Sequence, residues 1–142
     1  MAELDERAER GLAIFARMMG PVAHDAMREG ALSGKFASAI SRLAVDYAFG
    51  DVWSRDGLAM RERSLVTLGV LIAQRQVPEI KNHVKIGVRN GLTMREIEEV
   101  LVQATPYVGF PCIATATTAV IEALREIDMD PHVQTSEERG LL

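Results

Sequence analysis

The sequence predicts an all-α protein, and three observations carry that prediction. Aromatic residues make up only 5% of the chain, whereas alanine, valine, isoleucine, leucine and methionine are abundant. This composition suits helices that pack closely through small side chains better than it suits a β-sandwich. Apolar residues recur every three or four positions over long segments, which is the period of an amphipathic helix. Glycine and proline separate those segments where helices are expected to begin and end.

Three helices are expected in the first fifty residues, over 3–19, 22–28 and 35–49. Each has apolar residues at helical spacing and polar residues on its other faces. A glycine follows each of them and is expected to end it: Gly20, Gly30 and Gly50. The third helix is expected to bury one apolar side, formed by Phe36, Ile40, Leu43 and Tyr47.

The central segment of the chain is a helix expected from Met60 to Arg75. Between Ser64 and Ala73 it carries apolar side chains on every face rather than on one stripe, which is typical of a helix buried all round. The run is too short to cross a bilayer. We therefore expect this helix to lie at the centre of a small soluble domain.

Prolines and capping residues mark the helices of the second half. Pro78 suits the first turn of a helix, and Asn90-Gly91 marks its end through a left-handed cap. Thr93 to Glu96 has the pattern of a capping box at the start of the next helix. We expect that helix to end at Pro106 and a last helix to cover residues 112–127.

Length, charge and cysteine content limit the classes of protein. A chain of 142 residues without repeats or low-complexity segments predicts one domain, residues 1–142. A formal net charge of −4 and an isoelectric point near 5.4 argue against a nucleic-acid-binding surface. The acidic N-terminus lacks an apolar signal region, which predicts a cytoplasmic protein with no membrane partner. Cys112 is the single cysteine, so an intrachain disulfide and a Cys-x-x-Cys site are excluded.

Glu79 and His83 are the strongest candidates for chemistry. Four residues apart, they lie on one face of the helix that begins near Pro78. A carboxylate beside an imidazole fixes its tautomer and favours its protonated form, which suits a general acid near neutral pH. A solvated surface pair is the commoner explanation of this spacing, and His83 is expected at the edge of the apolar side.

The other polar candidates are less specific. The guanidinium groups of Arg55, Arg61 and Arg63 offer planar forks of donors that suit carboxylates. Arg61 and Arg63 are two residues apart on one helix, however, so at most one of them can face the core. The three histidines of the chain are scattered, and no metal site is expected. Cys112 follows Pro111 at a helix start, where a thiolate would be stabilised. A small buried apolar residue is the simpler role for it.

Several motifs together resemble the gamma-carboxymuconolactone decarboxylases. The matching residues run in one register over about 7–127, which makes the resemblance more specific than any single motif. They are Arg10-Gly11, Trp53-Ser54-Arg55-Asp56-Gly57, Arg61-x-Arg63, Glu79-x-x-x-His83, Asn90-Gly91-Leu92-Thr93, Glu96-Ile97-x-Glu99, and Tyr107-x-Gly109-x-Pro111. The wider superfamily includes AhpD-like alkylhydroperoxidases with a Cys-x-x-Cys pair. In this chain Gln76 and Glu79 stand at those two positions.

The resemblance implies a fold and a reaction. It implies an AhpD-like bundle of about six to seven helices in a homo-oligomer, a trimer or a hexamer, with the tail 129–142 flexible or wrapped around a partner. It implies decarboxylation of a small anionic lactone, most simply 4-carboxymuconolactone, in aromatic catabolism and without a cofactor. In this interpretation His83 delivers a proton and Glu79 orients it. The substrate would be bound by Arg55, Arg63, Trp53 and Tyr107.

Two other classes of function stay open at this point. One is a peroxidase-like redox protein, to which the missing cysteine pair is a direct objection. The other is a helical oligomer of the same family that binds a metabolite without transforming it. A His83 side chain that points into bulk solvent would favour this last class. An intact Glu79–His83 pair with nearby arginines lining one enclosed pocket would favour the decarboxylase.

Overall fold

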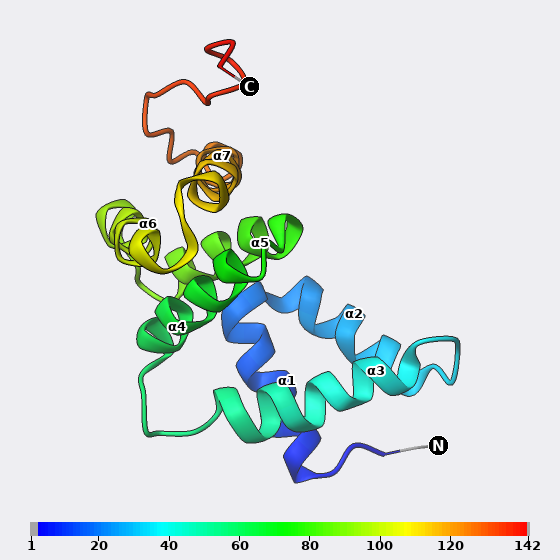
Figure 1. Ribbon diagram of the computed structural model, residues 1–142. Coiled ribbons are helices and arrows are strands. Elements are labelled where there is room, and N and C mark those ends of the chain that lie inside the picture. Colours follow the sequence, from blue (N-terminus) through cyan, green and yellow to red (C-terminus); the bar gives the residue numbers. More distant parts are fainter. Residues whose placement is uncertain (1–2, 142) are drawn as a thin grey trace. The chain divides into compact units, whose positions relative to one another are not determined.

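The chain forms two compact helical units, and the computed structural model describes residues 3–141. One unit extends to Met60, and the other begins at Arg61. All regular elements within residues 3–141 are helices, as predicted (Figure 1). Residues 1, 2 and 142 of the predicted domain lie outside the described part. The first unit contains α1 (Glu6–Met19), α2 (Pro21–Leu32), α3 (Ser38–Leu43) and the π-helix η1 (Ala44–Trp53). The second contains α4 (Met60–Ala73), α5 (Val77–Arg89), α6 (Met94–Val108) and α7 (Phe110–Glu126).

In the first unit, α1 packs on η1 through direct backbone contact at two glycines. A methyl group added to Gly11 would lie 2.0 Å from the carbonyl oxygen of Val45. One added to Gly50 would lie 2.7 Å from the carbonyl oxygen of Arg7. Only glycine permits so close an approach, so these two positions set the register of α1 against η1. Val45 joins the buried residues of α1 in the small core of this unit.

The face of residues 35–49 that the periodicity predicted to be buried is exposed. The fractional exposures of Phe36, Ile40, Leu43 and Tyr47 are 101%, 68%, 65% and 62%. The glycine contacts turn Val45 toward α1, and the side chains of the predicted apolar face point elsewhere. The segment is also divided into a short α-helix and a π-helix, which a uniform period of 3.6 residues does not describe.

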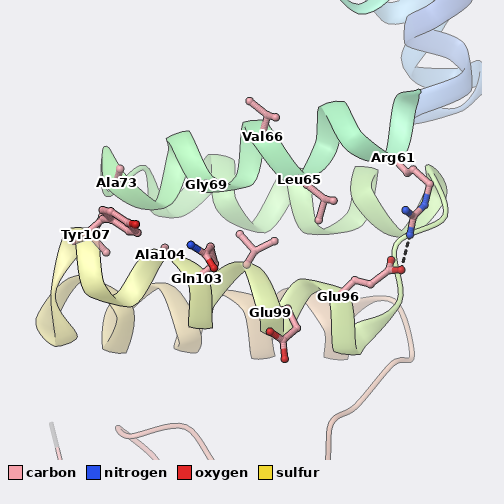
Figure 2. A pocket seen from close by; sticks show the side chains of 12 residues that line it. Arg61, Leu65, Val66, Gly69, Ala73, Glu96, Glu99, Gln103, Ala104 and Tyr107 are labelled. Atoms are coloured by element: carbon pink, nitrogen blue, oxygen red, sulfur yellow. Dashed lines mark hydrogen bonds and ion pairs between the residues drawn. The ribbon is translucent and has the colours of Figure 1, made fainter. Parts of the chain in front are cut away.

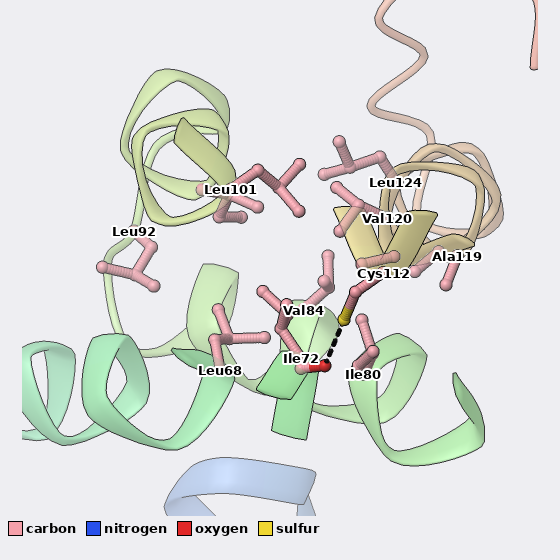
Figure 3. Packing of buried hydrophobic residues seen from close by; sticks show 13 residues of the cluster. Leu68, Ile72, Ile80, Val84, Leu92, Leu101, Cys112, Ala119, Val120 and Leu124 are labelled. Carbon is pink, nitrogen blue, oxygen red and sulfur yellow. Dashed lines mark hydrogen bonds between the residues drawn. The ribbon is translucent and has the colours of Figure 1, made fainter. Parts of the chain in front are cut away.

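In the second unit, α5 packs on α7, and apolar side chains from all four helices form one core (Figure 3). Leu68 and Ile72 of α4 meet Ile80 and Val84 of α5, each 1% exposed or less. Cys112 of α7 is buried here, and its Sγ donates a hydrogen bond to the backbone oxygen of Ile72 over 3.1 Å. The simpler role predicted for Cys112, a small buried side chain, is confirmed.

The predicted caps at Thr93 and Gly91 are confirmed, but four predictions about helix ends and helix burial are wrong. Thr93 and Glu96 form the expected capping box, and Gly91 follows α5 with a φ of 99°. Gly30 lies inside α2 and Gly50 lies inside η1, so neither glycine ends its helix. Pro106 lies inside α6, which ends only at Gly109, because a proline in the last turn removes a single backbone hydrogen bond. The central helix α4 is not buried all round, since two of its valines are about half exposed: Val66 and Val70.

The segment after α7 returns to that helix. Arg125 pairs with Glu138 at 2.8 Å, and the hydroxyl of Thr118 donates to Glu137 over 2.8 Å. Thr135 is 4% exposed and caps the last turn, accepting a hydrogen bond from the backbone N–H of Glu138. Within residues 3–141, no helix is long and apolar enough to span a membrane.

The glycine contact in the first unit gives the first testable prediction. Replacing Gly11 by alanine places a methyl group against the oxygen of Val45, so the backbones must separate, and we expect a loss of about 3 kcal/mol in the free energy of unfolding. Gly69 of α4 is the matched control, because a methyl group there meets nothing within 4 Å. Gly69→Ala should gain about 0.5–1 kcal/mol from helix propensity. Urea denaturation measures both; equal stability of Gly11→Ala and the unaltered protein would contradict the close contact.

Candidate functional site

Helix α5 brings Glu79 and His83 together. Pro78 lies in its first turn, where a missing N–H is harmless, and Ile80 and Val84 anchor the helix in the core. The imidazole Nε2 of His83 lies 4.0 Å from Oε2 of Glu79. The His83 side chain is only 15% exposed, whereas that of Glu79 is 55% exposed. The pair is therefore a buried imidazole with a solvent-accessible carboxylate at its edge.

Burial changes the proton affinity of His83 in the direction opposite to the one we expected. Loss of solvation lowers the pKa of His83, and the charge of Glu79 raises it by a smaller amount. The net pKa of His83 lies below its ordinary value of 6.5. Glu79 favours the protonated form, as expected. The expected net result, an imidazole that is readily protonated near neutral pH, is not found, because desolvation penalises the charged form more strongly than one exposed carboxylate stabilises it. The resting imidazole is neutral at pH 7.

Arg63 lies in the first turn of α4, in the same unit as His83. The next residue, Ser64, is fully buried, and its hydroxyl accepts a hydrogen bond from the Asn90 amide over 2.9 Å. Since Asn90 caps α5, the beginning of α4 lies beside the end of α5. His83 is seven residues earlier on α5, about 10 Å along the helix axis.

Arg61 is paired with two carboxylates. Its Nη2 lies 2.5 Å from Oε1 of Glu96, and its Nη1 lies 3.5 Å from Glu62. The hydrogen bond to Glu96 raises the pKa of Arg61 and that guanidinium stays charged. Its charge is already neutralised by carboxylates of its own unit. Arg61 is therefore a weak candidate for binding an anionic substrate.

Trp53 and Arg55 belong to the other unit, at the end of η1. The turn that holds them is closed by Ser54, whose hydroxyl donates to the Gly50 oxygen over 2.5 Å, and by the N–H of Arg55, which donates to the Val52 oxygen over 3.1 Å. Trp53 is partly buried, and Arg55 is exposed. Their part in substrate binding stays a prediction.

Tyr107 lies apart from the Glu79–His83 pair, in a groove that the sequence did not reveal (Figure 2). The groove has a volume of about 660 Å³ and runs between α4 and α6. Its polar lining includes Arg61, Glu96 and Tyr107. Its apolar lining comes from Leu65, Val66 and Gly69 of α4 and from Val100, Ala104 and Val108 of α6. The all-round apolar run of α4 was the signal for it, since part of that run faces this groove.

The described residues hold no cluster that suits a metal ion. Nowhere in residues 3–141 do three or more His, Cys, Asp or Glu side chains gather in a way that could bind one. His24 instead contacts its neighbour Asp25 through Nδ1 at 2.8 Å.

Comparisons with known proteins find one matching family and two relatives that are named as decarboxylases. The model of the carboxymuconolactone decarboxylase family matches residues 38–123. The chain is 30% identical over 129 residues to a 4-carboxymuconolactone decarboxylase of Acinetobacter baylyi, covering 89% of this chain and 93% of that enzyme. It is 42% identical over 72 residues to a nitrosuccinic acid decarboxylase of Metarhizium robertsii, covering 50% of each chain. All six predicted site residues lie within the part that the family matches.

The depressed pKa of His83 predicts how stability depends on pH. Below about pH 6.5 the imidazole of the unfolded chain takes up a proton while the folded one resists it. The unfolded state then binds more protons, so stability falls as the pH drops through this range toward the folded pKa. His83→Gln has no titrating group there, and its melting temperature should fall less between pH 7 and pH 5. Parallel melting curves for the two proteins would contradict the burial of a neutral His83.

Proposed function

The chain belongs to the carboxymuconolactone decarboxylase family, and we propose that it converts 4-carboxymuconolactone into β-ketoadipate enol-lactone and CO₂ without a cofactor. That it is a carboxy-lyase follows from the family and from the two relatives named as decarboxylases. The observation that supports the site is the buried His83 beside Glu79. Burial favours an acid–base role over a surface ion pair, because solvated pairs leave the pKa of an imidazole near its ordinary value.

The proposed substrate provides its own electron sink. The carboxylate that leaves is on a saturated ring carbon next to a double bond that is conjugated with the lactone carbonyl. When the C–C bond to CO₂ breaks, its electron pair moves through that double bond onto the carbonyl oxygen and gives a furanolate. Protonation of a ring carbon then completes the enol-lactone. The protein has to hold the substrate, stabilise the developing oxyanion and deliver one proton. Neither a metal ion nor pyridoxal phosphate is needed to accept the electrons.

His83 delivers that proton in our proposal, after the substrate has changed its proton affinity. The resting imidazole is neutral, so it must take up a proton before it can act as an acid. An anionic substrate bound against the imidazole stabilises its charged form and raises its pKa. Glu79 acts in the same direction and orients the ring. Binding of an anionic substrate therefore promotes proton uptake by His83.

The remaining site residues bind the substrate in our proposal. Arg63 and Arg55 bind the carboxylate that stays on the substrate and the developing oxyanion, through the planar donors of their guanidinium groups. Trp53 and Tyr107 form part of the wall of the substrate-binding site with their aromatic rings. Tyr107 lines the groove between α4 and α6, to which neither Glu79 nor His83 contributes, so its role requires a site completed by a second copy of the chain. We accordingly propose a cytoplasmic homo-oligomer, a trimer or hexamer, that acts in aromatic catabolism.

The second relative suggests how far the substrate of this family can vary. Nitrosuccinate also carries a carboxylate on a carbon whose electron pair can be delocalised, in that case into a nitro group. A site that supplies cationic groups and one proton, and leaves electron acceptance to the substrate, serves both molecules. The substrate class is therefore a carboxylate next to an internal electron acceptor, of which 4-carboxymuconolactone is our first choice and nitrosuccinate the comparison.

Turnover of freshly generated 4-carboxymuconolactone tests the proposal directly. We expect its absorbance to be lost with release of CO₂, and we expect His83→Ala to lower kcat by roughly 10²- to 10⁴-fold, the contribution of a positioned proton donor. Glu79→Gln keeps the shape of the side chain and should cost less. An unchanged melting temperature at pH 7.5 shows that each variant is folded. Near-normal turnover by His83→Ala would show that His83 is not the proton donor. Turnover of nitrosuccinate but not of 4-carboxymuconolactone would assign nitrosuccinate as the substrate instead.

The pH dependence of turnover gives a further prediction. The profile of kcat/KM reports the free enzyme, so it should decline as the pH rises through the lowered pKa of His83, below 6.5. The profile of kcat reports the complex, in which the substrate raises the same pKa, and its decline should occur at higher pH. Glu79→Gln should move the decline in kcat/KM to still lower pH, because Glu79 raises the pKa of His83. Superimposed profiles of kcat and kcat/KM would contradict protonation on binding.

A further inference from the structure

The groove between α4 and α6 is kept open by a glycine that its own chain does not require. Gly69 lies in the middle of α4, where glycine costs about 0.5–1 kcal/mol relative to alanine. A methyl group at this position would meet nothing within 4 Å. Val66 and Tyr107 beside it are 59% and 81% exposed. In a single copy of the chain the apolar groove is therefore empty, although the glycine that leaves this space lowers the stability of α4.

The first unit carries an exposed surface of matching character, which we call the apolar stripe: Phe36, Ile40, Leu43 and Tyr47. Ile40, Leu43 and Tyr47 follow the spacing of one side of a helix, and Phe36 lies in the turn just before Ser38, where α3 begins. Given exposures of 62–101%, these four side chains present roughly 500 Å² of largely apolar surface, at the upper end of what a monomer usually exposes. The core of this unit lies on Val45 and does not use the stripe.

We propose that the apolar stripe of one copy of this chain occupies the groove between α4 and α6 of a second copy. The stripe spans twelve residues, from Phe36 to Tyr47, and the α4 wall of the groove spans thirteen, from Arg61 to Ala73, or about 18 Å. The open space at Gly69 admits a large side chain of the stripe. Exposed Lys35, which directly precedes the stripe, and exposed Glu99 in the groove carry opposite charges.

A second copy fits this groove better than the anionic substrate does. The walls of the groove are mainly aliphatic, and the one guanidinium in its lining, that of Arg61, is already paired with Glu96. An anion would gain little there, because no uncompensated positive charge is available in the lining. The roughly 500 Å² of the stripe is more than half of the ~800 Å² that each partner buries in a stable interface.

The contact joins two different surfaces, so it is a head-to-tail interface. Each copy has one stripe and one groove, and every surface is covered only when the copies close into a ring. This inference deepens the homo-oligomer that we proposed together with the function. It concerns assembly alone, and it can be tested without substrate, so its failure and a failure of the decarboxylase proposal are distinguishable.

Two variants of the full chain separate the halves of the interface. The stripe variant carries Ile40→Gln and Leu43→Gln, and the groove variant carries Gly69→Glu, which places a charged side chain in the apolar groove. Gly69→Ala is the matched control, because a methyl group leaves most of the groove open. Val22→Gln, which replaces another exposed valine outside both surfaces, controls for general loss of apolar surface. Sedimentation velocity measures the mass, and thermal melting shows that each variant is folded.

We expect the unaltered protein and both controls to form the same oligomer, and each interface variant alone to sediment as a monomer of about the 15.6 kDa chain mass. An equimolar mixture of the two interface variants retains one intact stripe and one intact groove, and should give a dimer of twice that mass. A groove variant that still assembles, or a mixture that stays monomeric, overturns the proposal, as does a monomeric unaltered protein. Should either variant fail to fold, Phe36→Gln and Val66→Gln replace them, since both side chains are exposed.

Discussion

The backbone contact between α1 and η1 determines which side chains of the first unit are available to the outside. Gly11 and Gly50 allow the two helices to approach until carbonyl oxygens occupy the space of a side chain. This contact selects Val45 for the core. Because a helix cannot turn two opposite faces inward at once, Phe36, Ile40, Leu43 and Tyr47 are left exposed. A packing constraint on small residues thereby creates the surface through which we infer that copies of the chain associate.

Competition between burial and charge decides the chemistry of the second unit. His83 lies where the core side of α5 meets a more exposed face, so its imidazole loses most of its solvent while the carboxylate of Glu79 keeps its own. Desolvation prevails, and the imidazole rests in its neutral form. In a fully solvated pair the pKa of the imidazole would stay near its ordinary value and would respond little to a substrate, because water screens the added charge. A buried one responds strongly, because each charge brought near it acts through little water.

The sequence predicted what depends on neighbouring residues and missed what depends on distant ones. The capping box at Thr93 and the left-handed Gly91 were predictable because a few adjacent side chains determine them. The exposed stripe was not, because the choice of core face at residues 35–49 is made by glycines in α1 and η1. The direction of the His83 pKa was missed for the same reason, since burial is contributed by other helices. The spacing of Glu79 and His83 did predict their proximity, because both lie on one helix.

Gly69 also has a consequence for anyone who engineers this protein. Screens for heat resistance reward substitutions that improve helix propensity, and a glycine in the middle of α4 with free space around it is an obvious target for them. Large residues chosen there on the basis of a single copy would look harmless, because nothing in that copy clashes with them. If assembly uses the groove as we infer, such a screen would select more robust subunits that no longer recognise one another. The effect of a substitution at Gly69 can therefore be judged only in the assembled protein.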